Sequence, residues 1–301
     1  MISTQTAFAG PFLEADPSLF ARRFDELAFQ FSHRLADHPL FAPERLLALA
    51  KTMAANPADI YYDAGKVEVG QRWDQIPVCD MPIDQLLQRI ETADAWVVLR
   101  KAEKVPEYAA LLDACIAEIE TLAGRDLSRV MKLRNAIIFI NSPHRVSTYH
   151  IDRECNFLLQ LRGQKTISVF DRYDRAVLPE DEIERFWAVD NNSAVFKPEF
   201  QERAMVMELT PGSAVHIPVN SPHWVKNGPE VSVSLSINFH YHDALLGDVY
   251  RANYWLRRLG LEPKPPGSAP RLEALKARVY GSSRSFFRAA KSLKAKVRGS
   301  R

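Results

Sequence analysis

The chain has 301 residues, of which 47% are hydrophobic and 10% aromatic, enough to bury the core of one large domain or of two small ones. Its formal net charge is only +2, but the charge is distributed unevenly. Residues 251–301 carry 14 basic and 2 acidic side chains, which leaves 25 basic and 35 acidic ones for residues 1–250. The net charge is therefore +12 for residues 251–301, the tail, and −10 for residues 1–250, the body. This separation of charge predicts a separate role for the tail.

Several classes of protein are excluded by what the sequence lacks. Cys79, Cys115 and Cys155 are an odd number without paired spacing, so neither a disulfide framework nor a zinc cluster is expected, and a reducing cytosol suits them. The N-terminus shows no secretory signal, and no apolar run approaches the roughly 18–20 residues of a membrane span. With only 12 glycines and no glycine-rich phosphate loop, a nucleotide-binding fold is not indicated. We expect a soluble cytoplasmic protein.

Residues 1–130 are expected to form a mostly helical α+β region that packs on a later barrel. Apolar residues at helical spacing predict the helices, and proline marks where several of them begin or end. Short apolar runs without that spacing predict strands. We expect helices at residues 17–36, 44–53, 83–90 and 106–122, a strand or hairpin at residues 60–70 and a strand at residues 95–99.

Residues 131–243 change character and predict a mainly β core. Short apolar segments alternate there with turn signals such as Arg162-Gly163 and Pro211-Gly212, a rhythm typical of an antiparallel barrel or jelly roll. Residues 244–301 return to helix, with a Pro-rich linker between Pro263 and Pro270. The expected strands are residues 136–140, 147–152, 156–161, 166–170, 204–209, 214–218 and 231–239.

One pair of side chains in this core predicts a metal site. His150 and Asp152 are two residues apart, so on a strand they point to the same side. An imidazole and a carboxylate are two thirds of the facial site that holds non-haem iron. His223, which follows a short apolar strand and the Pro-rich loop that presents it, is the candidate for the third ligand.

Polar residues on otherwise apolar strands predict a ligand pocket beside this site. Lys165 lies among apolar positions, and burying its charge is costly unless an anion meets it. Asn156 and Asn238 likewise occupy apolar strands. Such residues are what a pocket with a few polar groups requires.

Residues 135–241 resemble the JmjC/cupin-like Fe(II)- and 2-oxoglutarate-dependent oxygenases, especially their asparaginyl-hydroxylase branch. The resemblance covers about a third of the chain. It rests on His150-Ile151-Asp152, Asn156-Phe157, Arg162-Gly163-Gln164-Lys165, Pro211-Gly212, Ile217-Pro218 with His223, and Ser236-Ile237-Asn238-Phe239.

The resemblance implies a double-stranded β-helix, the jelly-roll or cupin barrel, between the N-terminal α+β region and the C-terminal helices. It also implies that His150, Asp152 and His223 hold Fe(II), and that O₂ and 2-oxoglutarate are consumed. Lys165 would pair with the distal carboxylate of 2-oxoglutarate, helped by the hydroxyl of Ser147 or Thr148. Asn156 and Asn238 would line the cosubstrate pocket. His216 departs from the pattern, since an aromatic residue is expected at its position.

The substrate stays open, because surface charge steers association without identifying a partner. A peptide or protein side chain and a small metabolite are both candidates, and the reaction could end in hydroxylation or in demethylation. Two other function classes are a metal cupin of the sugar isomerase or epimerase type, and a non-catalytic ligand-sensing regulator with a basic tail. An isomerase would not need Lys165 as an anchor for a dicarboxylate, and no nucleic-acid-binding motif supports the regulator.

The basic tail has an apolar stripe of its own. Phe286, Ala290, Leu293 and Val297 fall at helical spacing among many Lys and Arg residues. A frayed terminus would have this composition, and so would a helix that docks on an anionic lipid or on nucleic acid. We favour a homodimer through the C-terminal helices, because the acidic body supplies the complementary charge.

Overall fold

The computed structural model describes residues 10–76, 79–240 and 244–282. Contacts divide the chain into two compact units. The first combines Met1–Val177 with Val195–Tyr241, and the second combines Leu178–Ala194 with His242–Arg301. In the part of the chain that the structure describes, no helix combines the length and the apolar character of a membrane span.

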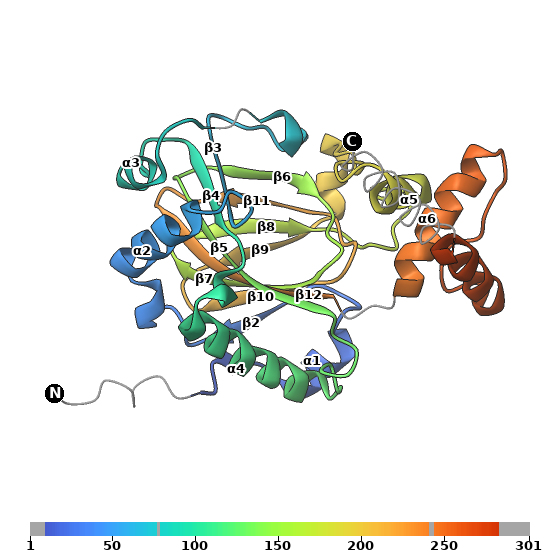
Figure 1. Ribbon diagram of the computed structural model, residues 1–301, viewed down its shortest axis with the longest axis horizontal. Coiled ribbons are helices and arrows are strands. Elements are labelled where there is room, and N and C mark those ends of the chain that lie inside the picture. The colour runs from blue at the N-terminus through green and yellow to red at the C-terminus, as the bar shows by residue number, and fades with distance from the viewer. Residues whose placement is uncertain (1–9, 77–78, 241–243, 283–301) are drawn as a thin grey trace, which may run out of the picture. The chain divides into compact units, whose positions relative to one another are not determined.

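The first unit is built on two antiparallel sheets (Figure 1). From β5 onward the chain passes repeatedly from one sheet to the other, which produces the central order β10-β7-β12-β5 in the larger sheet and β6-β11-β8-β9 in the smaller one. This arrangement is the double-stranded β-helix, and it confirms the predicted fold class. The strands are β5 (Leu133–Asn141), β6 (Val146–His150), β7 (Cys155–Arg162), β8 (Lys165–Val169), β9 (Met205–Leu209), β10 (Ser213–Ile217), β11 (His223–Asn227) and β12 (Ser232–His240).

Two pairs of N-terminal strands widen the larger sheet to eight strands. At one edge β2 (Phe29–His33) pairs with β10, and β1 (Leu13–Glu14) pairs with β2. At the other edge β4 (Ala95–Leu99) pairs with β5, and β3 (Ile60–Ala64) pairs with β4. The N-terminal region thus contributes to the sheet that carries half of the barrel.

The barrel core lies between the two sheets and follows the two-residue period of the strands. Its members come from five of the eight barrel strands, with Ala28 just before β2, and Phe139 of β5 packs against them. The inward side chains of the core are Leu158, Ile167, Val169, Met207, Leu209, Val215, Ile217 and Val225. Because side chains alternate along a strand, these residues show which other positions on the same strands also face the interior.

The outer face of the larger sheet is covered by helices α1 (Pro17–Arg23) and α4 (Pro106–Ala123) (Figure 1). Asp16 caps α1 by accepting the backbone N–H groups of Ser18 and Leu19, and Gly124 ends α4 in the left-handed conformation. Phe20 of α1 is fully buried against Phe157 of β7, with ring centroids 5.8 Å apart. This second apolar layer explains why β7 is buried on both faces. The remaining helices of this unit are α2 (Pro43–Ala54) and α3 (Ile83–Gln88).

The single helix predicted over residues 17–36 is wrong beyond residue 23. Helix α1 stops there, Asp25 adopts φ 54°, and residues 29–33 form β2. Phe29, Phe31 and His33 are buried while the residues between them are exposed, so the same apolar residues also fit a two-residue period. Pairing with the free edge of β10 decided between the two periods.

The element predicted over residues 60–70 is a strand only to residue 64, after which Gly65 takes φ 115°. The other predicted elements are confirmed, with boundaries shifted by a few residues. Strand β11 was not predicted as a strand, because the sequence places its first residue, His223, after a Pro-rich loop. Its alternation of buried and less buried residues is short, and polar side chains stand at both ends. Cys79, Cys115 and Cys155 are free thiols, as expected.

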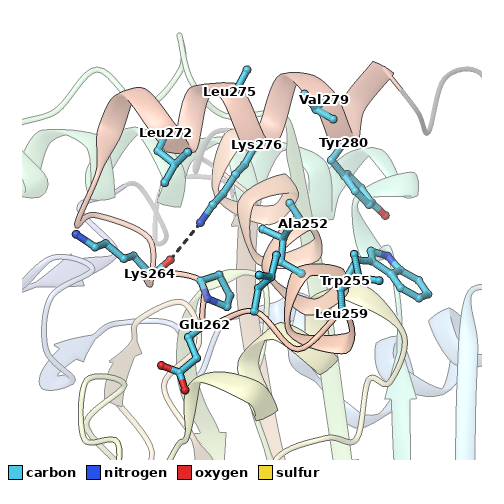
Figure 2. A pocket seen from close by; sticks show the side chains of 13 residues that line it. Ala252, Trp255, Leu259, Glu262, Lys264, Leu272, Leu275, Lys276, Val279 and Tyr280 are labelled. Atoms are coloured by element: carbon cyan, nitrogen blue, oxygen red, sulfur yellow. Dashed lines mark hydrogen bonds between the residues drawn. The ribbon is translucent and has the colours of Figure 1, made fainter.

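The second unit contains helices α5 (Glu180–Ala188) and α6 (Ala244–Arg258) and a helix over residues 270–282. Within it, the buried carboxylate of Glu184 accepts two hydrogen bonds from Arg257, at 2.7 and 2.9 Å. A groove of about 1060 Å³ lies between α6 and the last helix (Figure 2). Its walls include Trp255, Leu275 and Val279, which are 50%, 57% and 62% exposed. The predicted stripe at Phe286–Val297 lies outside the described residues.

Candidate metal centre

Strands β6 and β11 place the three predicted ligands together at one end of the smaller sheet. His150 stands opposite His223 in the register, and Asp152 follows β6 by two residues. Asp152 Oδ2 lies 3.8 Å from His150 Nε2 and 3.7 Å from His223 Nε2. The two imidazole centroids are 4.2 Å apart. The three residues that the sequence predicted as metal ligands therefore lie close together in the structure.

Backbone carbonyls fix the tautomer of both histidines. His150 Nδ1 lies 2.6 Å from the Thr148 carbonyl oxygen, and His223 Nδ1 lies 3.0 Å from that of Ser221. Since a carbonyl can only accept, Nδ1 carries the proton in each ring and Nε2 keeps its lone pair. Both lone pairs are on the side of the ring that faces Asp152, which is the arrangement that outer hydrogen bonds impose on metal ligands.

Burial keeps His223 neutral. Desolvation, with a smaller electrostatic effect of nearby His150, lowers the pKa of His223 from 6.5 to about 3. A metal ligand must be deprotonated at its donor atom, and His223 is so at physiological pH.

The donor set fits one divalent ion. Separations of 3.7 and 3.8 Å exceed hydrogen-bond length, so the three groups do not satisfy one another. Two ligand atoms that each lie about 2.1 Å from a common ion can be at most about 4.2 Å apart, and both measured separations are shorter. His223 is buried while the side chains of His150 and Asp152 are 27% and 32% exposed, which leaves the cluster accessible from one side.

A β-bulge on β6 determines which hydroxyl group shares the interior with His150. Between the pairs His223–His150 and Val225–Ser147, β6 contains one more residue than β11. Directly opposed residues point to the same side of a sheet, and Val225 belongs to the barrel core. Ser147 therefore faces the interior. Thr148 is buried next to it, and its carbonyl group holds His150.

Lys165 is a cation inside the barrel. It begins β8 on the face shared with Ile167 and Val169 of the core, and it is only 4% exposed. Desolvation lowers its pKa from 10.5 to about 7. Within the described residues its ammonium group makes no hydrogen bond or ion pair. A buried cation of this kind calls for an anionic ligand.

Asn156 and Asn238 face the same interior from the larger sheet. They stand opposite each other on β7 and β12, and Asn156 also opposes Ile217 of the core. The Ser236 hydroxyl joins them, because it donates to Asn156 Oδ1 at 3.0 Å and accepts from Asn238 Nδ2 at 2.9 Å. The structure thus brings the predicted site residues other than Thr148 to the barrel interior or, for Asp152, to its end.

Sequence reasoning missed a row of serines on β12. Ser232, Ser234 and Ser236 are fully buried and point inward with Asn238. Ser234 donates to Gln160 Oε1 at 2.7 Å, and Gln160 Nε2 donates to the Ser232 hydroxyl at 2.9 Å. The strict alternation of serine with Val233, Leu235 and Ile237 was the signal for a polar inner face.

His216, the residue that departs from the family pattern, lies on the other side of the sheet. Its neighbours on β10, Val215 and Ile217, point into the core, so His216 points outward. Its ring stacks on Phe157 and Phe24, with centroids 4.5 and 5.5 Å away. Desolvation lowers its pKa from 6.5 to about 4. It thus takes the place of an aromatic residue in the outer apolar layer.

The fold can be compared with solved structures. A structure of E. coli YcfD matches with a TM-score of 0.54 over 90% of this chain and 68% of that one, at 17% sequence identity. Another matches with a TM-score of 0.50 over 90% of this chain and 67% of that one, at 16% sequence identity. It is described as the ribosomal oxygenase YcfD from E. coli in complex with cobalt and 2-oxoglutarate. No protein-family model matches the sequence, and no curated protein matches it. The chain has the fold of these oxygenases.

This likeness confirms the fold that the resemblance implied. It covers the N-terminal region as well as the barrel, since 90% of the chain is matched. The asparaginyl-hydroxylase branch and the division at residues 130 and 243 stay predictions.

Proposed function

We propose that the protein is an Fe(II)- and 2-oxoglutarate-dependent oxygenase that hydroxylates a protein side chain. One observation carries the proposal: a two-histidine, one-carboxylate cluster and an unpaired buried lysine belong to the same barrel. The first can hold a metal with coordination positions left for ligands, and the second can hold a carboxylate. The similar structure with cobalt and 2-oxoglutarate supports the pairing of these two ligands in this fold.

His150, Asp152 and His223 would hold the iron. Bound Fe(II), with 2-oxoglutarate and O₂, supplies the oxidising power for C–H hydroxylation, and 2-oxoglutarate leaves as succinate and CO₂. The backbone carbonyls of Thr148 and Ser221 accept from Nδ1 of the two rings, which orients each Nε2 towards Asp152 as the ligand atom.

The barrel interior would bind the cosubstrate. The Lys165 ammonium would meet the distal carboxylate in a charge-assisted hydrogen bond, and the inward hydroxyl of Ser147 would add a second donor. Asn156 and Asn238, held by Ser236, would line the pocket from the opposite sheet. The apolar side chains between these groups exclude water, which strengthens both contacts.

A protein substrate is favoured by two observations. The similar structures are described as ribosomal oxygenases. Residues 1–250 carry a balance of −10, which would attract a basic polypeptide.

The test is a screen of basic peptides and of small metabolites, scored by succinate formation with Fe(II) and by mass spectrometry of the substrate. Succinate together with a gain of one oxygen in a peptide is expected. A sugar isomerase would act without consuming O₂, and a ligand-sensing regulator would bind 2-oxoglutarate without turnover. Either result would refute the proposal.

We also propose that the second unit mediates self-association. Trp255, Leu275 and Val279 expose apolar surface in the groove between α6 and residues 270–282 (Figure 2). A second copy would cover this surface, and its acidic body would offer the charge that complements the basic tail.

Sedimentation equilibrium at two salt concentrations tests this interface. Truncation after Pro270 removes one wall of the groove, so it should shift the protein towards monomer, with the larger effect at low salt. Leu275→Glu should act in the same direction, whereas Leu133→Glu on β5, where the leucine is 63% exposed, is the matched control. Equal masses for the full-length, truncated and Leu275→Glu proteins would rule out self-association through this surface.

A further inference from the structure

The loop at residues 218–222, between β10 and β11, contacts the candidate metal centre at two points. The backbone N–H of Asn220 donates to the carbonyl oxygen of Asp152 at 2.9 Å. The carbonyl group of Ser221 accepts a hydrogen bond from His223 Nδ1 at 3.0 Å. The backbone of this loop therefore fixes the main chain of one ligand and the ring orientation of another.

Asp25 and Arg172, both distant from this loop in the sequence, form hydrogen bonds with its residue Val219. The backbone N–H of Val219 donates to Asp25 Oδ1 at 3.0 Å, and its carbonyl group accepts from Arg172 Nη1 at 3.1 Å. Asp25 and Arg172 also form an ion pair at 3.3 Å, with side chains only 3% and 12% exposed. A second nitrogen of Arg172 donates to the backbone carbonyl of Asp25. Both polar groups of one loop residue are thus held by a single buried ion pair.

The ion pair is itself anchored through His216. The backbone N–H of Asp25 donates to His216 Nε2 at 2.8 Å, and His216 Nδ1 lies 3.1 Å from the carbonyl oxygen of Asn156. Asp25, His216 and Cys155 are close enough to hold a metal ion, because one donor atom of each lies within 4.8 Å of the others. Both nitrogens of the imidazole are already engaged with protein groups, so His216 supports the backbone of Asp25 instead of offering a free lone pair.

The backbone conformations of Asp25 and of the loop residue Asn220 agree with a fixed loop geometry. Asp25 has φ 54° and Asn220 has φ 61°, in the left-handed region that Asp and Asn tolerate better than other non-glycine residues. Such conformations persist where the surroundings determine them, and they are frequent near functional sites.

We propose that Asp25 and Arg172 are positioning residues of the metal centre. By fixing both backbone groups of Val219, they set the loop that orients His223 and holds the main chain of Asp152. This inference rests on the proposed metal site and goes beyond it, because neither residue touches the ligands' donor atoms.

The experiment measures Co(II) binding to the metal-free protein by visible absorption, together with thermal melting of the same samples. Asp25→Asn keeps the size and the left-handed preference but removes the charge, and Arg172→Lys keeps the charge but cannot reach both Asp25 and Val219. The matched control is Asp63→Asn, which breaks the buried ion pair between Arg145 and Asp63 away from the loop.

Asp25→Asn and Arg172→Lys should each weaken Co(II) binding about tenfold or more, within the range found when groups that orient metal ligands are replaced. Asp63→Asn should lower the melting temperature and leave Co(II) affinity unchanged. If Asp25→Asn gives no cooperative melting transition, Arg172→Lys decides alone. Wild-type affinity in the folded variants, or loss of the folded state in both, would overturn the proposal. Failure of the wild-type protein to bind Co(II) would instead overturn the metal site itself.

Discussion

Replacing Lys165 with methionine removes the ammonium group but keeps an unbranched side chain. In the metal-free protein without 2-oxoglutarate, the ammonium is buried and has no partner within the described residues. Lys165→Met should therefore stabilise this form. With 2-oxoglutarate the same change should weaken cosubstrate binding, because the charge-assisted hydrogen bond is lost. One substitution thus has two expected effects of opposite sign.

The magnitude of the stabilisation follows from the pKa of Lys165. Burial lowers this pKa from 10.5 to about 7, which corresponds to at most about 5 kcal/mol at 1.36 kcal/mol per unit. Between pH 7 and 10.5 the unfolded state binds more protons than the folded state, so the free energy of unfolding of the wild-type protein rises with pH. The advantage of Lys165→Met should be largest below pH 7 and should disappear near pH 10.5.

Urea denaturation of the metal-free protein at pH 6.5, 8 and 9.5, followed by tryptophan fluorescence, measures this difference. Lys226→Met is the control, since Lys226 is exposed on the neighbouring strand β11. Steady-state kinetics should show the apparent 2-oxoglutarate constant of Lys165→Met raised at least about tenfold, since each decade corresponds to about 1.4 kcal/mol. A destabilised Lys165→Met protein, or an unchanged cosubstrate constant, would refute the assignment.

Three further outcomes are expected from single substitutions. Asp152→Ala should keep the wild-type melting temperature without metal but lose both Co(II) binding and succinate formation, and retained Co(II) affinity would show that Asp152 is not a ligand. Ser147→Ala should raise the apparent 2-oxoglutarate constant several-fold, for a hydrogen bond of about 0.5–1.5 kcal/mol, whereas an equal effect of Thr148→Val would contradict the orientation set by the bulge. Phe20→Ala should lower the free energy of unfolding by about 3–5 kcal/mol, since Phe20 is fully buried. The control Leu27→Ala, at a residue that is 44% exposed, should change this free energy by less than about 0.5 kcal/mol. Similar values for the two variants would show that the outer apolar layer is not well packed.

The candidate ligands His150 and Asp152 and the buried Lys165 could be predicted because their signals are local. His150 and Asp152 share a face for any strand that contains both, whatever the strand pairs with. Lys165 stands out because a charged residue among inward apolar positions is costly without a ligand. The joint spacing of these residues with His223 then supported the resemblance to the oxygenase family, which agreed with the barrel predicted from the strand rhythm.

The surroundings of the site depended on pairings that the sequence does not display. Residues 29–33 carry apolar residues that suit both a helix and a strand, and the free edge of β10 made them a strand. The inward position of Ser147 depends on a bulge, which appears only once β6 is aligned with β11.

The sequence by itself indicated the barrel class from the rhythm of its short strands, the three candidate metal ligands from their residue types and joint spacing, and the buried cation from its apolar neighbours. Only the tertiary structure decided that His216 faces the outer apolar layer and that Asp25 and Arg172 meet at Val219. Asp25 and Val219 are 194 residues apart in the chain. Contacts of such separation depend on how the sheets close on each other, and no local pattern encodes them.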